Sequence, residues 1–82
     1  MASITGKSYR LKRFFRQDYH YGAVSIETKE KKKAKIYFDD RELYSIACDA
    51  HILGADIIIE YDMIVSERPF TVICKAVEIA RE

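Results

Sequence analysis

Residues 39–79 constrain the fold most, because a helix, a turn and two strands can be read from them in order. A helical pattern runs over residues 39–53 and ends at Gly54, a residue that commonly forms a left-handed C-cap. Asp39 can accept backbone N–H bonds at the helix start, and Glu42 three positions later completes a pattern that resembles a capping box. We therefore predict one long helix with defined ends.

Strands are predicted on both sides of this helix. Residues 55–65 and 70–79 are rich in β-branched and aromatic side chains and flank a turn at residues 66–69. Three shorter strands are predicted earlier in the chain, at residues 9–15, 22–28 and 34–38. We predict an α+β fold, an antiparallel sheet of four or five strands with one main helix packed on one face. The 82 residues contain no repeat or linker and predict a single domain.

Apolar residues occupy two faces of these elements. At 100° per residue, one helix stripe contains Leu43, Ile46, Ala47, Ala50 and Leu53. A second set lies opposite the expected core, on the helix and on the last two strands, and consists of Tyr44, Ile52, Ile58, Ile64, Ile73 and Val77. Two partly apolar faces in so short a chain predict association, so we assign this second set to a homo-oligomer interface.

Charge is distributed unevenly along the chain, although the formal net charge is only +1. Residues 1–35 contain ten basic and three acidic side chains, whereas residues 36–82 contain four basic and ten acidic ones. Such asymmetry is typical of a nucleic-acid surface, and equally of a contact in which one subunit's basic part meets its neighbour's acidic part. Solvated faces of strands and turns explain it as well.

Basic residues near the N-terminus alternate with the rings of Tyr9, Phe14 and Phe15. Rings beside cations can stack on bases while the cations bind phosphates, so nucleic-acid binding is an alternative function. The predicted polyanion contacts are Arg10, Lys12, Arg13, Arg16, Lys31, Lys32 and Lys33. Against this alternative, the near-neutral net charge is unlike that of a dedicated nucleic-acid domain, and rings in a strand more often belong to the core.

Metal and catalytic chemistry have weaker support. Cys48 and His51 lie at i and i+3 on the helix and could share one ion, but a structural site needs three or four ligands. The other candidates, Cys74 and His20, stand at no defined spacing from this pair. The sequence has no Gly-rich phosphate loop and no nucleophile motif. We therefore predict a non-enzymatic protein without a cofactor.

The sequence also predicts a compartment. No apolar run approaches the roughly 20 residues that a membrane helix needs, so no membrane association is expected. Two cysteines are too few for a disulfide framework, which favours reduced thiols in the cytoplasm.

The run SIACDAHILGADIIIEYDMIV, followed by FTVICKAVEIA, resembles the YbjQ-type heavy-metal-binding domain family. The matching positions are Ala50, Leu53, Gly54, Ala55, Asp56, Ala76 and Val77, with a looser match at Tyr19, Gly22 and Val24. Cys74 and Lys75 depart from the family pattern, which commonly has Gly-Thr there. The resemblance implies a compact helix-and-sheet domain that assembles into rings, typically pentamers, and it brings no ligand set for a metal.

The leading functional prediction is accordingly a ring-forming scaffold or accessory binding module, with a protein partner possible and nucleic acid as the alternative ligand.

Overall fold

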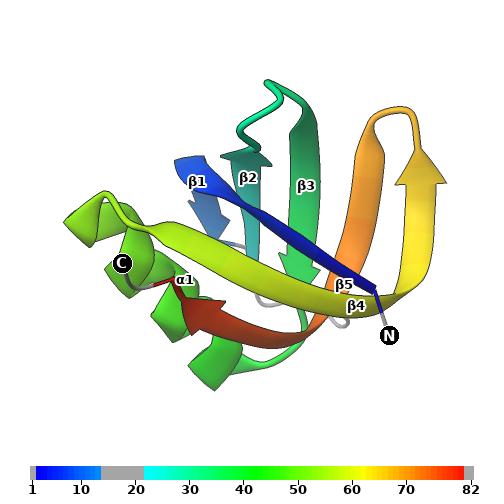
Figure 1. Ribbon diagram of the computed structural model, residues 1–82. Coiled ribbons are helices and arrows are strands. Elements are labelled where there is room, and N and C mark those ends of the chain that lie inside the picture. Colours follow the sequence, from blue (N-terminus) through cyan, green and yellow to red (C-terminus); the bar gives the residue numbers. More distant parts are fainter. Residues whose placement is uncertain (1, 14–21, 81–82) are drawn as a thin grey trace.

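The computed structural model describes residues 2–13 and 22–80 of the chain, for Arg13 the backbone alone. Five strands and one helix follow one another in this part (Figure 1). They are β1 (Ala2–Arg13), β2 (Gly22–Glu27), β3 (Lys33–Phe38), α1 (Arg41–Leu53), β4 (Asp56–Glu67) and β5 (Phe70–Ile79). The predicted α+β composition and the number of strands are confirmed.

The strands close into a barrel in the order β1-β2-β3-β5-β4, with β4 paired to β1. Four of the five neighbouring pairs are antiparallel, but β3 and β5 are parallel, so the expected all-antiparallel sheet is wrong in this respect. The parallel pair arises because α1 and β4 intervene between β3 and β5 and return the chain to the same end of the barrel. The helix contacts all five strands, rather than covering one face of an open sheet as predicted.

β1 bridges two parts of the barrel, pairing with β4 through residues 2–7 and with β2 through residues 7–13. At the crossing point, a Cβ atom on Gly6 would lie 2.7 Å from the Glu27 carbonyl oxygen, so the close approach requires a glycine. The sequence-based strand began only at residue 9. The first seven residues of β1 were missed because they are mostly small or polar and show no apolar alternation.

The core is formed by inward-facing side chains of four strands and of the helix. Its largest fully buried members are Phe38, Ile26, Ile36, Ile57, Ile59, Val24 and Val72. On β2 and β3 these residues alternate with outward-facing ones, as the two-residue period of a strand requires.

The ends of α1 are capped by Asp40 and Gly54. The Asp40 carboxylate accepts hydrogen bonds from the backbone N–H groups of Glu42 (2.7 Å) and Leu43 (3.4 Å), so the N-cap is Asp40 and not Asp39. Gly54 adopts the left-handed conformation (φ 68°) that was predicted for it.

The buried face of α1 is a row of residues three apart, Tyr44, Ala47 and Ala50. The Tyr44 ring packs edge-on against Phe38, with the ring centroids 5.7 Å apart, and is only 6% exposed. Its predicted place on a face opposite the core is therefore wrong. The predicted stripe shares Ala47 and Ala50 with this row, but Leu53, at the last residue of α1, is 70% exposed and not part of the core as predicted.

Val77 is also placed differently from the prediction. Cys74 pairs with Tyr61 and Ala76 pairs with Glu60, so Lys75 is an extra residue in β5. One inserted residue exchanges the two faces of a strand beyond it. Val77 consequently lies opposite Ile59 and packs against the core instead of facing away from it.

Candidate nucleic-acid interface

The outward-facing side chains of β1, β2 and β3 form one continuous face of the barrel. The strand register aligns them in three rows, Lys12–Ala23–Tyr37, Arg10–Ser25–Lys35 and Lys7–Glu27–Lys33. β1 contains a bulge between Ser8 and Arg10, so Tyr9 is an extra residue of this strand and is 48% exposed. The middle strand thus contributes small residues to the first two rows, whereas the two outer strands contribute three long basic side chains and the ring of Tyr37.

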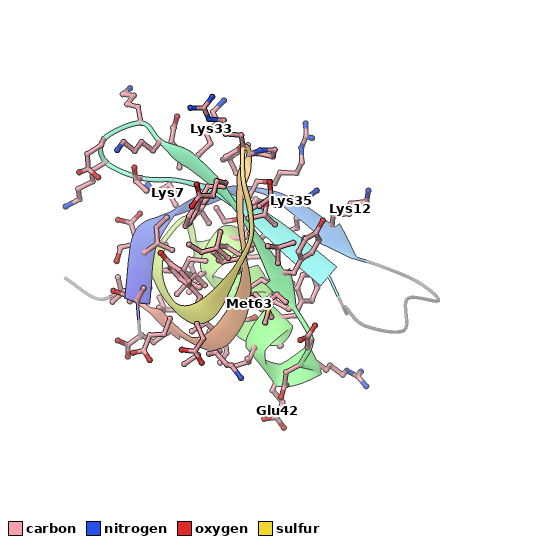
Figure 2. All side chains as sticks on the ribbon, turned by 90° about the vertical axis from the view of Figure 1, so that its right-hand side faces the viewer. Lys7, Lys12, Lys33, Lys35, Glu42 and Met63 are labelled. Atoms are coloured by element: carbon pink, nitrogen blue, oxygen red, sulfur yellow. The ribbon has the colours of Figure 1, made fainter. Side chains whose placement is uncertain are left out.

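This arrangement produces a groove of about 260 Å³. Ala23 and Ser25 form its floor, and it extends to Pro69 in the turn between β4 and β5. Four cationic side chains line it, Arg10, Lys12, Lys33 and Lys35. Among the described residues that line the groove, none carries a carboxylate. Figure 2 shows Lys12, Lys33 and Lys35 spread along one side of the molecule, whereas Glu42 projects from α1.

Two tyrosines bring aromatic rings to the same face. The Lys33 Nζ atom lies 5.6 Å from the centroid of the Tyr9 ring, and the Lys35 Nζ atom lies 5.4 Å from that of Tyr37. Both distances are within the range of cation–π attraction, which holds each ammonium group close to a ring. The face therefore offers positive charge for phosphates next to a half-exposed ring on which a base can stack.

The structure brings together only some of the predicted polyanion residues. Arg10, Lys12 and Lys33 line the groove, whereas Lys31 and Lys32 lie in the turn between β2 and β3 and do not. The Arg13 backbone pairs with Gly22. Three residues of the prediction, Arg16, Phe14 and Phe15, and the side chain of Arg13 lie outside the described part of the chain.

Sequence reasoning missed Lys35, the fourth cation of the groove. The signal for it was present, because residues two apart in a strand share a face and Lys33 was already a candidate. The small floor residues Ala23 and Ser25 gave no such signal, since they become a floor only when long side chains flank them on both neighbouring strands.

The two residues of the predicted metal-binding pair make different contacts. Cys48 is half-buried against the core, and His51 shares a hydrogen bond between its Nδ1 atom and the Ser8 hydroxyl (2.9 Å). Within residues 2–13 and 22–80, no three His, Cys, Asp or Glu side chains come together in a way that could hold a metal ion. His20 lies outside these ranges.

Cys74 is buried in the barrel, and its Sγ atom donates to the Ala76 carbonyl oxygen (3.4 Å). Burial raises the pKa of the Cys74 thiol to about 12, and the negative charge of Asp40 adds to this shift. Because the thiolate is the form that binds metals and acts as a nucleophile, Cys74 is unsuited to either role.

The remaining predicted interface residues lie at different depths. Ile52 is 80% exposed and Ile64 is 44% exposed, whereas Ile58 and Ile73 are half-buried. Leu53 adjoins Ile52 at the end of α1, and Met63 and Val65 flank Ile64 on β4; all three are also exposed. The barrel thus has two apolar patches, one at the end of α1 and one near the β4–β5 turn, well apart in Figure 1.

Comparison with protein-family models, with curated proteins and with solved structures finds no match for this chain. The resemblance to the YbjQ-type family therefore stays a prediction. The described barrel has five strands in the order β1-β2-β3-β5-β4, with the helix between β3 and β4, and is similar in architecture to the OB-fold, which is also a five-stranded barrel. OB-folds bind oligonucleotides on the face of their second and third strands, but a shared fold does not establish a shared function.

No helix in the described part is long and apolar enough to span a membrane.

Proposed function

We propose that this chain is a non-enzymatic module that binds single-stranded nucleic acid across the outer face of β1, β2 and β3. One observation carries the proposal: four cations line a single groove with a small-residue floor, beside the half-exposed Tyr9 ring. The site also coincides with the face that OB-folds use for oligonucleotides, which supports the assignment by analogy.

The groove chemistry suits a single strand better than a duplex. Phosphates of the strand would lie against Arg10 and Lys35, which share a row across the floor. A base would stack on Tyr9, and the Ser25 hydroxyl can donate or accept one hydrogen bond at the floor. Bases inside a duplex are already stacked on one another and cannot reach such a ring. These contacts depend little on base identity, so we expect weak sequence preference.

This proposal reverses the order of the two functions considered from the sequence. The prediction of a ring-forming scaffold relied on six interface residues. Of these, Tyr44 is buried in the core and Val77 is partly buried against it. The near-neutral net charge no longer argues against nucleic-acid binding, because basic residues gather on one face of the barrel. Local charge, and not the sum over the chain, attracts a polyanion.

The test is a binding measurement with labelled oligothymidylate, oligouridylate and a duplex of the same length, followed by fluorescence anisotropy. We expect both single strands to bind more tightly than the duplex. Tyr9→Ala should weaken single-strand binding by about tenfold, because one stacked base contributes about 1–3 kcal/mol. Thr5→Ala, at an exposed β1 position outside the groove, is the matched control. Equal affinity for duplex and single strand, or no effect of Tyr9→Ala, would refute the proposal.

A second candidate function, self-association, is favoured by the two exposed apolar patches. They differ in composition and position, so a contact between the Ile52–Leu53 patch of one copy and the Met63–Val65 patch of the next would be heterologous. Heterologous contacts generate rings when the rotation closes. This candidate agrees with the predicted homo-oligomer and leaves the basic groove open, and the expected cytoplasmic location is compatible with both functions.

A further inference from the structure

A second, larger hollow lies between the β2–β3 turn and the β4–β5 turn. Its volume is about 730 Å³, within the usual range for small-ligand pockets. Residues from the start of β1, from both turns and from the middle of β4 line it. We call this hollow the mouth pocket.

The interior of the mouth pocket is aromatic and apolar. Tyr61 and Phe70 meet edge to face, with their ring centroids 5.8 Å apart and their planes at 75°. Ile4 and Pro69 complete the apolar lining. Because the two rings are nearly perpendicular, a flat ring stacked on one of them meets the edge of the other, an arrangement that aromatic pairs favour.

Charged side chains around this interior distinguish between parts of a nucleotide. Lys32, Lys33 and Arg68 attract a polyanion toward the mouth pocket. Glu30 and Glu67 also line it, so a phosphate inside would meet carboxylates as well as cations. A neutral, flat base avoids this repulsion and covers the apolar surface.

The mouth pocket adjoins the basic groove, because Lys33 and Pro69 line both. A strand that lies in the groove can therefore extend into the mouth pocket past Lys33. The Lys33 ammonium group, next to the Tyr9 ring, is suitably placed for the phosphate that joins the two parts of the strand.

We infer that the mouth pocket receives one unstacked nucleobase of the strand whose backbone occupies the groove. This inference rests on the proposed function and adds a second, base-binding subsite to it. It predicts that affinity increases with strand length until one nucleotide reaches the mouth pocket, and that Phe70 provides the ring on which its base stacks.

The experiment compares the wild-type protein with Phe70→Leu, which keeps an apolar side chain but removes the ring. Oligothymidylates of about 2 to 12 nucleotides are used, a series that reaches into the usual site sizes of OB-folds. We expect Phe70→Leu to weaken binding of the longer strands by about tenfold and to leave the shortest bound strands unaffected. Unchanged binding of short strands also shows that the variant is folded. Ser45→Ala, at an exposed α1 position outside both sites, is the control.

A fluorescent base analogue placed at each position of a long strand gives an independent readout. One position should be strongly quenched in the wild-type complex and should recover in Phe70→Leu. Equal binding of all lengths by both proteins would overturn the inference while leaving the groove intact. Equal weakening of all lengths would overturn it as well. A change in the oligomeric mass of the Phe70→Leu variant, without a change in its affinity for the strands, would also overturn it. Failure of the wild-type protein to bind any strand would instead refute the proposed function.

Discussion

Replacing Lys35 by Gln removes one of the four groove cations and keeps a side chain of similar length. Each phosphate neutralised on a single strand releases counterions, so the logarithm of affinity falls by about 0.7 per tenfold rise in salt for each contact. If all four cations bind phosphates, the slope is about −2.8, and affinity falls about 50-fold between about 50 and 200 mM salt. With three cations the slope is about −2.1 and the loss is about 20-fold.

The assay is anisotropy of a labelled oligothymidylate, titrated at several sodium chloride concentrations. Lys75→Gln is the matched control, because it removes the same charge from an exposed β5 position outside the groove. Surface substitutions of this kind change the unfolding free energy by less than about 0.5 kcal/mol, so both variants should remain folded. We expect a shallower slope for Lys35→Gln and an unchanged slope for Lys75→Gln. Equal slopes for the two variants would mean that binding follows net charge and that the groove is not the site.

Four further outcomes are expected. Asp40→Ala should lower the unfolding free energy in urea by about 1 kcal/mol through loss of the N-cap. Folding raises the pKa of Cys74 from 9.0 to about 12, so the contribution of this thiol to the unfolding free energy should be constant below pH 9.0 and decrease between pH 9.0 and about 12. In pH-dependent unfolding, Cys74→Ala should lack this decrease. Light scattering at micromolar concentration should show a homo-oligomer that Ile52→Asp dissociates, a pentamer being the size that the family resemblance implies; a monomer throughout that range would contradict this. Elemental analysis should find no stoichiometric zinc or copper, and one ion per chain that is lost in Cys48→Ser would disprove it.

Local patterns were sufficient to predict most elements of the fold. The helix and the strands from residue 22 onward were predictable because their apolar periodicity, caps and turns involve residues close in sequence. Barrel closure was not, since it depends on the pairing of β1 with β4 and on the short parallel contact between β3 and β5. These pairings join residues far apart in the chain, and no local pattern specifies them.

Two bulges account for important errors in placing side chains. Tyr9 in β1 and Lys75 in β5 are each one residue in excess of the partner strand. Alternation read from a sequence assumes an unbroken period of two, so an inserted residue reverses every assignment beyond it. This is why Val77 was assigned to the wrong face, and why the exposed position of Tyr9 beside Arg10 could not be derived.

The candidate site was predictable in its chemistry but not in its shape. Arg10, Lys12 and Lys33 were identified from charge and from nearby rings. The groove itself depends on the register that places Ser25 between Arg10 and Lys35. The sequence of one strand does not determine its register with its neighbours.

The most direct test of the central claim, that the outer face of β1, β2 and β3 binds a single strand, is an NMR titration of the isotopically labelled protein with oligothymidylate. Saturable shifts of the backbone amide signals are predicted at Tyr9, Arg10, Ser25 and Lys35, because these residues line the groove. Amide signals in α1 should stay unchanged, since the helix lies outside it. Saturable shifts confined to α1 or to the apolar residues 63–65 of β4, with the groove unaffected, would contradict the account.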